Sequence, residues 1–307
     1  MNYPEFLSTI CRSMEKHYTK AAVSVRQVLK NNGTRLDGLL ILQPGENIAP
    51  TIYLNPYFTR YQNGTSLKDI LKEIAAVYEK HRFPSLFDLS LLRDFDRIRN
   101  HISFRLINRS SNLELLPDIP FIPFLDLAVV FFFTLEDEII GRSSVLIHNS
   151  HLALWKKTKE ELFGLAKTNT RFLTGCEIIP LEHLLSAETD KETLPPASAS
   201  EIFILSNRTR LFGAACLLYQ DLLASFSSML QDDFYVLPSS IHEVLLLPVK
   251  KSPSAASLLE MVQEINRAEV APEDVLSDHI YLYRAAKRRL GVVLPAGSCK
   301  TEPSRIR

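Results

Sequence analysis

A short polar motif, PSSIHE, holds the residue types of a nucleophile and a general base. On an extended strand alternate residues share a face, so Ser240 and His242 would point the same way while Glu243 points away. A serine beside an imidazole is the beginning of a nucleophile and base pair, and Asp126 or Asp221 could supply the acid that orients the ring. Hydrolysis is the chemistry that this combination would perform.

The same motif also fits a hairpin turn. After a proline, the hydroxyls of Ser239 and Ser240 would satisfy backbone groups of the turn, and His242 and Glu243 would begin the next strand. We take the turn as the main expectation. Ligand binding, with Ser239 and Glu243 in contact with the ligand, and catalysis by Ser240, His242 and Asp126 are the alternatives.

Two histidines, His148 and His151, lie three residues apart near Trp155. On a helical turn both imidazoles could face one metal ion, but a metal site needs three or four ligands, and no cysteine or carboxylate follows at a useful spacing. We therefore expect His151 and Trp155 to pair at the start of a helix. The sequence predicts no metal site and no cofactor.

Three acidic residues, Asp37, Asp126 and Glu201, each precede an apolar run. Each run is followed by a turn, a second apolar run and a helical pattern, so the segments 37–81, 126–168 and 201–231 read as strand, turn, strand, helix. A duplicated module and three unrelated hairpins both explain this. The carboxylates could gather at one sheet edge, but we expect each to end a buried run and bond a neighbouring backbone amide.

A last helix is predicted from about residues 272–277 to Gly291, and it would place Arg284, Lys287 and Arg288 on one face. Since 35 basic residues balance 35 acidic ones, no net field attracts nucleic acid or anionic lipid, and a solvated face is the expectation. Docking of these three residues on an acidic partner is the alternative. No glycine-rich phosphate loop, HExxH or EF-hand pattern occurs.

The elements that position these residues can be read from apolar spacing. Ser66 caps a helix over 66–81. The run Leu127–Phe133 is apolar at consecutive positions, which predicts a central strand that is buried on both faces. Further helices are predicted at 86–98, 155–167, 220–231 and 254–267. Further strands are predicted at 101–107, 234–237 and 242–247.

The polar, Pro/Ser-rich stretch 188–200 reads as a linker. It would divide an N-terminal part, 1–187, from a C-terminal part, 201–291, with a flexible tail at 292–307. The four cysteines are widely spaced and form no CxxC pair, which is typical of a reducing compartment. No signal peptide or spanning segment is recognisable, so we expect a cytoplasmic protein without membrane contact.

The motifs LDGLLIL, PTIYLNPYF, LDLAVVFFF, PSSIHEVLLLP and LSDHIYLY resemble an uncharacterised family of bacterial, mainly clostridial, cytoplasmic proteins that carries only a domain-of-unknown-function label. The likeness runs from about residue 20 to 290. It implies a bacterial source and a shared α+β fold, but no activity and no catalytic residue.

The predicted fold class is α+β, with mostly antiparallel hairpins and helices packed on them. Because no complete catalytic set is assembled, the first functional hypothesis is a non-enzymatic interaction or regulatory module with a bacterial protein partner. The alternative is a hydrolase-like enzyme that uses Ser240 and His242. Nucleic acid is not the expected partner.

Overall fold

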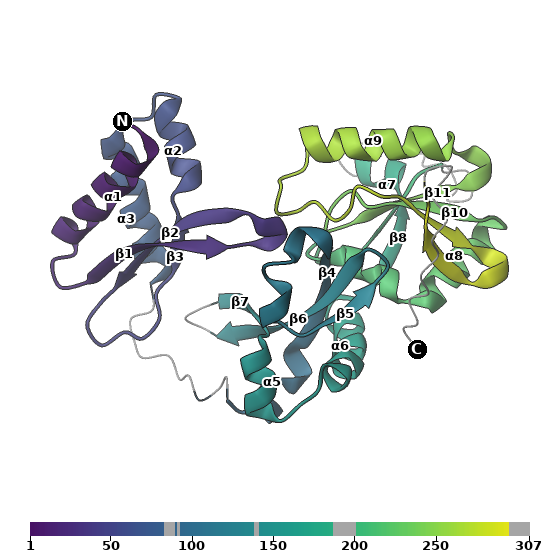
Figure 1. Ribbon diagram of the computed structural model, residues 1–307, viewed down its shortest axis with the longest axis horizontal. Coiled ribbons are helices and arrows are strands. Elements are labelled where there is room, and N and C mark those ends of the chain that lie inside the picture. Colours follow the sequence, from purple (N-terminus) through teal and green to yellow (C-terminus); the bar gives the residue numbers. More distant parts are fainter. Residues whose placement is uncertain (83–89, 91–92, 138–140, 187–200, 295–307) are drawn as a thin grey trace. The chain divides into compact units, whose positions relative to one another are not determined.

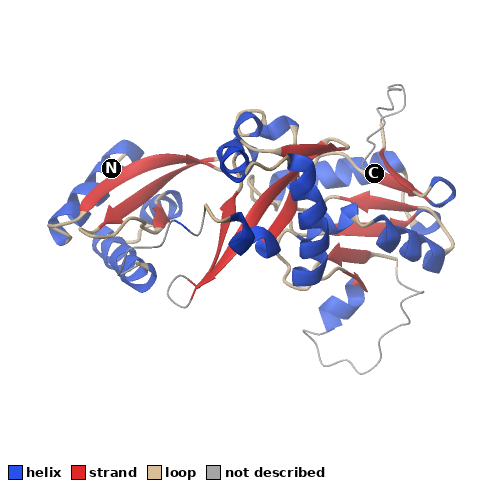
Figure 2. Cartoon of the chain, turned by 90° about the horizontal axis from the view of Figure 1, so that it is seen from below, coloured by secondary structure: helices blue, strands red, loops and turns tan. Residues whose placement is uncertain are grey.

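The computed structural model describes residues 1–82, 90, 93–137, 141–186 and 201–294 (Figure 1). The chain forms two compact units. Unit 1 comprises Met1–Asp94 and Leu135–Ser143, and unit 2 comprises Phe95–Thr134 and Ser144–Arg307. Within each unit helices (blue) lie beside strands (red) in Figure 2, and every strand pair with an established register is antiparallel, so the predicted α+β class is confirmed.

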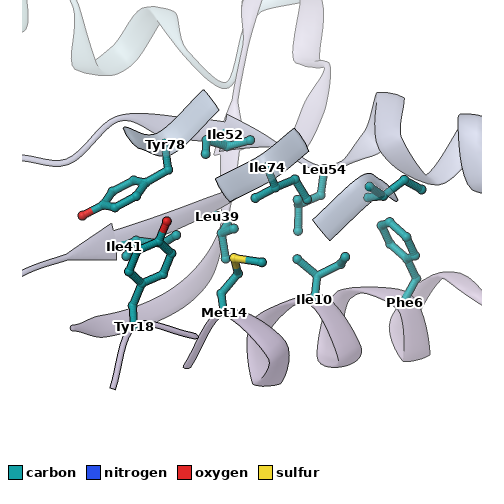
Figure 3. Close-up of a cluster of buried hydrophobic side chains, with 11 residues drawn as sticks. Phe6, Ile10, Met14, Tyr18, Leu39, Ile41, Ile52, Leu54, Ile74 and Tyr78 are labelled. Carbon is teal, nitrogen blue, oxygen red and sulfur yellow. The ribbon is translucent and has the colours of Figure 1, made fainter. Parts of the chain in front are cut away.

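The described residues of unit 1 form an antiparallel sheet in the order β1-β2-β3, together with the helices α1, α2 and α3. Its elements are α1 (Tyr3–His17), β1 (Ala22–Leu29), β2 (Arg35–Leu42), β3 (Thr51–Tyr53), α2 (Asn55–Gln62) and α3 (Leu67–His81). Figure 3 shows the core, in which α1 and α3 bury Ile10, Met14 and Ile74 against Leu39 and Ile41 of β2. This burial of apolar surface is the main term that stabilises the unit.

The helix predicted at 66–81 is confirmed as α3. Ser66 is its N-cap and accepts a hydrogen bond from the backbone of Asp69, and the apolar face buries Ile70, Ile74 and Tyr78. A side-chain cap and an apolar stripe of helical period are both local signals, which is why the sequence alone locates this helix.

The first sheet of unit 2 has β6 at its centre, between β4 and β5, and β7 pairs with β6. The elements of this part of the chain are α4 (Phe95–Ile98), β4 (Ile102–Asn108), β5 (Phe121–Phe124), β6 (Leu127–Asp137), β7 (Gly141–Leu146), α5 (Asn149–Trp155) and α6 (Lys159–Thr174). The end of β6 and the start of β7 belong to the residues 135–143 that are assigned to unit 1. The central strand is confirmed, since residues 127–131 of β6 and Phe133 are fully buried. Phe132 is only half-buried, and its ring packs edge-on against that of Phe212 at a centroid distance of 5.4 Å.

The second sheet of unit 2 is antiparallel throughout, in the order β13-β12-β10-β11-β9-β8. Its strands are β8 (Glu177–Pro180), β9 (Phe203–Ser206), β10 (Phe234–Leu237), β11 (Val244–Pro248), β12 (Tyr281–Arg284) and β13 (Arg289–Val292). The helices of this part are α7 (Leu181–Ser186), α8 (Gln220–Leu230) and α9 (Ala255–Ala268), with the short 3₁₀ helices η7 (Gly213–Leu218) and η9 (Ala285–Lys287). The predicted helices at 220–231 and 254–267 and the strands at 234–237 and 242–247 are confirmed.

The last predicted helix is wrong. The segment forms the hairpin β12–β13 instead, because Tyr281 and Tyr283 pair with Val236 and Phe234 of β10 and are buried, while Leu282 between them is only half-buried. The short apolar segment IYLY fits a strand as well as a helix, and its pairing with β10 decides in favour of the strand.

The third predicted hairpin is also wrong. Its first strand, β9, pairs with β8 and β11, and its second apolar run is the buried 3₁₀ helix η7. The first two predicted strand pairs, β2–β3 and β6–β7, are present. Segment 201–231 is therefore no copy of them, and a duplication of the other two remains a prediction.

Some predictions lie outside the described residues. These are residues 86–89 and 91–92 of the helix predicted at 86–98, the linker at 188–200 and the tail beyond residue 294. The described end of that helix is the short α4 (Phe95–Ile98). The division into parts 1–187 and 201–291 stays a prediction, although β8 and β9, which flank the linker, pair in one sheet. The helix predicted at 155–167 is shifted, because Lys156 ends α5 in the left-handed conformation and Thr158 caps α6.

Candidate functional site

The PSSIHE motif forms a turn between β10 and β11. The Ser239 hydroxyl donates to the carbonyl of Glu243 at 3.0 Å, and the Ser240 hydroxyl accepts from the backbone N–H of His242 at 3.0 Å. The backbone N–H of Ser240 also donates to the Glu243 carbonyl. Both hydroxyls therefore serve the backbone of the turn, which is the main expectation from the sequence.

The ring of His242 is engaged away from Ser240. Its Nδ1 accepts from the backbone N–H of Phe212 at 3.3 Å, and its Nε2 lies 3.4 Å from Asp274 Oδ1. The imidazole also stacks on the Phe212 ring, with an interplanar angle of 15°. His242 thus connects the loop before η7 to the segment that precedes β12, and the geometry favours a structural role.

Asp126 is at the centre of a polar cluster in unit 2. Its Oδ2 accepts from the Ser277 hydroxyl at 2.5 Å and lies 3.0 Å from His279 Nδ1, and its Oδ1 accepts from the Tyr281 hydroxyl at 2.8 Å. Sequence reasoning selected Asp126 as an acid for His242. The structure brings it to His279 instead.

The surroundings of Asp126 shift three pKa values. Burial alone would raise the pKa of the Asp126 carboxyl, but the hydrogen bonds from His279, Ser277 and Tyr281 together hold that pKa below its ordinary value. The hydrogen bond to Asp126 raises the pKa of His279. Burial, and secondarily the Asp126 charge, raises the pKa of Tyr281 well above its ordinary value.

The cluster contains a serine, a histidine and an aspartate, but in the wrong order for nucleophilic catalysis. A catalytic triad places the imidazole between the acid and the serine. Here the Ser277 hydroxyl donates to the carboxylate itself, and it lies 3.5 Å from His279 Nδ1, the ring nitrogen that already faces Asp126. The cluster therefore anchors the start of β12 to the turn before β6.

The basic residues Arg284, Lys287 and Arg288 lie in the β12–β13 hairpin. Arg284 ends β12, Lys287 is in η9, and Arg288 follows in the left-handed conformation with φ 46°. All three are exposed. They share a hairpin loop and not a helix face, so the predicted arrangement is wrong while their exposure to solvent is as expected.

The pairing of His151 with Trp155 is confirmed, since the two rings stack at a centroid distance of 5.3 Å and an angle of 15°. His151 Nδ1 accepts from the backbone N–H of His148 at 3.0 Å, and burial lowers the pKa of His151. Within the part of the chain that the structure describes, no three His, Cys, Asp or Glu side chains gather at metal-binding distance.

In unit 1, Asp37 accepts from the Tyr3 hydroxyl at 2.8 Å.

A pair of cysteines is the feature that sequence reasoning missed. Cys176, immediately before β8, and Cys216 in η7 are 40 residues apart, and their Sγ atoms lie 2.7 Å from each other. Cys216 is 2% exposed, and Cys176 is half-buried. No spacing motif marks two cysteines that different elements bring together, so only the fold reveals them.

A pocket of about 670 Å³ lies between α6 and the start of α8. We call it the α6 pocket. Its lining combines apolar and charged side chains: Phe124, Lys167, Thr168, Arg171, Phe172, Leu217, Leu218, Tyr219, Gln220 and Asp221. A smaller pocket of about 460 Å³ lies in unit 1, beside the exposed ion pair between Arg60 and Glu73.

A hydrogen bond, a cation–π contact and an ion pair hold the α6 pocket in shape. The Tyr219 hydroxyl donates to the Lys167 carbonyl at 3.0 Å, and burial raises the pKa of Tyr219. The Arg171 guanidinium lies over the Tyr219 ring, 5.2 Å from its centroid, and pairs with Asp221 at 2.7 Å. At the mouth, the Phe172 side chain is 87% exposed.

The described residues contain no helix that is both long and apolar enough to cross a bilayer. No curated protein and no solved structure matches the chain. Residues 3–285 match DUF5688, a family of unknown function. This match covers nearly the whole chain, and the protein therefore belongs to the DUF5688 family.

Proposed function

We propose that the protein is a non-enzymatic interaction module of the bacterial cytoplasm that captures an extended segment of a partner protein at the α6 pocket. The observation that carries the proposal is Phe172. Its ring is 87% exposed at the mouth of a pocket of about 670 Å³, although an aromatic side chain gains most when it is buried.

The apolar part of the pocket suits a large apolar side chain of the partner. Phe124, Leu217 and Tyr219 contribute to its lining, and Leu217 and Tyr219, at the end of η7, are themselves almost fully buried. A pocket that is already formed needs little reorganisation, which favours binding. Exposed Phe172 would then cover the bound side chain, as aromatic residues do in the centres of protein interfaces.

The charged residues of the pocket determine which residue of the partner is favoured next to that apolar side chain. Arg171 is paired with Asp221, whereas Lys167 makes no ion pair with any residue that the structure describes. The lining thus carries two basic residues and one acidic residue, so a carboxylate on the partner complements it. The expected ligand is a segment with a large apolar residue next to Asp or Glu.

A displayed library of random peptides, selected against the full-length protein, tests this proposal. Enriched peptides are expected to carry an apolar residue beside an acidic one and to lose at least about tenfold in affinity on Phe172→Ala or Lys167→Glu, which corresponds to about 1.4 kcal/mol. The Lys167→Glu variant should in addition favour peptides in which a basic residue replaces the acidic one, because the charge at position 167 is then negative.

Met229→Ala is the matched control, since Met229 is 48% exposed and is not in the pocket lining. It should bind the selected peptides as the wild type does. Thermal unfolding of each variant checks that the fold is intact, and exposed positions such as Phe172 should tolerate the change. Peptides that bind the wild type, Phe172→Ala and Lys167→Glu equally would overturn the proposal.

A further inference from the structure

The Cys176 and Cys216 thiols are held in contact by two separate elements. Cys176 follows Gly175, the left-handed residue that ends α6, and so stands at the entry to β8. Cys216 lies in η7, where its thiol donates to Cys176 Sγ at 2.7 Å and also faces the carbonyl of Ser206 at 3.4 Å. A disulfide of about 2.05 Å needs the sulfur atoms to approach by about 0.65 Å more.

The two thiols have different surroundings. Cys176 is half-buried and is the more accessible residue of the two, since Cys216 is 2% exposed. The hydrogen bond from Cys216, together with the nearby Arg171 charge, lowers the pKa of Cys176. The pKa of Cys216 is raised, mainly by the hydrogen bond to Cys176 and secondarily by burial. An accessible thiol beside a shielded one is the arrangement of an attacking and a resolving cysteine.

We propose that Cys176 and Cys216 form a thiol–disulfide exchange site that reacts with low-molecular-weight disulfides. The Cys176 thiolate attacks one sulfur of the small disulfide, forms a mixed disulfide and expels one thiolate, which takes up a proton. Cys216 then gives up its proton and attacks Cys176 Sγ, which forms the bond between the two cysteines and expels the second small thiol. Two electrons pass from the protein to the small disulfide.

An ordinary packing role accounts for part of this geometry, because a free cysteine behaves as a small apolar residue. It does not account for a second sulfur at 2.7 Å or for the partial exposure of Cys176. In a reducing compartment, disulfides that do form are mostly transient or redox-sensing, so the site would respond to the state of the thiol pool. The site stands on its own geometry and not on peptide capture by the α6 pocket.

The test uses the full-length, reduced protein and oxidised glutathione as the probe. Intact-mass and peptide mass spectrometry should show that the wild type loses two hydrogens and gains a Cys176–Cys216 bond. Cys216→Ser should instead accumulate one glutathione on Cys176, because the resolving thiol is missing. This adduct should form at least about tenfold faster than one on Cys11, which lies in α1 and has a raised pKa through burial.

Cys176→Ser should form neither the bond nor an adduct on Cys216, since the attacking thiol is gone and Cys216 is shielded. Cys11→Ser is the matched control and should react as the wild type does. Thermal unfolding of the reduced proteins checks folding, and Cys176→Ala repeats the test if serine perturbs it. A wild type that keeps both thiols free, or a Cys216→Ser variant whose Cys176 reacts no faster than Cys11, overturns the proposal.

Discussion

Asp126 Oδ2 lies 3.0 Å from His279 Nδ1, although 153 residues separate them in the chain. The Asp126 side chain is 22% exposed and that of His279 is 49% exposed, so the carboxylate is the shielded partner. This contact joins the turn before the central strand β6 to the segment that leads into β12. Its charge state should therefore affect the stability of unit 2.

The stability from this pair should depend on pH in a defined direction. The pKa of His279 is raised from 6.5, so its contribution is fully present below about pH 6.5 and is lost as the pH rises through the folded-state pKa. The pKa of Asp126 is lowered from 3.8, so its contribution is present above about pH 3.8 and is lost as the pH falls through the folded-state pKa.

Urea unfolding of the wild type and His279→Gln from pH 4 to 9 measures this dependence. The wild type should be more stable by up to about 1 kcal/mol between the two ordinary pKa values, a small figure because half of the His279 side chain faces solvent. The advantage should shrink toward pH 9. His101→Gln, at an exposed position, is the control, and a pH-independent difference for His279→Gln would contradict the linkage.

Asp126→Asn should destabilise the protein at pH 7 by about 2 kcal/mol. The change removes the charge that accepts from Ser277, His279 and Tyr281, and it leaves the buried Tyr281 hydroxyl with a weaker acceptor. Denaturant unfolding measures the loss. Asp118→Asn is the control, because Asp118 is exposed, and a loss for Asp126→Asn no larger than that of the control would assign the cluster no structural role.

Gly213→Ala should destabilise unit 2 by about 1–3 kcal/mol. A Cβ at this position would overlap Ser206 Oγ, the His242 carbonyl and the backbone nitrogen of Asn207, and the backbone atoms have no room to move away. Gly164→Ala in α6 meets nothing within 4 Å and should be neutral or stabilise by up to about 1 kcal/mol. Thermal or urea unfolding measures the stability of the two variants. Equal changes in the free energy of unfolding for Gly213→Ala and Gly164→Ala would refute the close approach of η7 to β9.

A serine-reactive fluorophosphonate should not label Ser240. Its hydroxyl accepts from the backbone of His242, and the ring that would have to take its proton faces Phe212 and Asp274. Mass spectrometry of the treated protein measures labelling, with Ser240→Ala as the background control. Labelling of Ser240 that disappears in His242→Ala would instead support the hydrolase alternative.

Local signals in the sequence determined several elements correctly. The capped helix α3, the central strand β6 and the turn at Ser239 and Ser240 each depend on neighbouring residues, through capping, apolar spacing and turn chemistry. The stack of His151 on Trp155 followed from helical spacing in the same way. These features need no knowledge of distant partners.

Tertiary structure decided the rest, because the choice depended on partners far away in the chain. The segment at Tyr281 and Tyr283 is a strand because β10 offers it an edge, and η7 is not a strand because β8 and β11 already occupy both edges of β9. The contacts of Asp126 with His279 and of Cys176 with Cys216 arise only when the chain closes loops of 153 and 40 residues. Nothing in residue spacing specifies such closures, since packing of the whole core determines which ends meet.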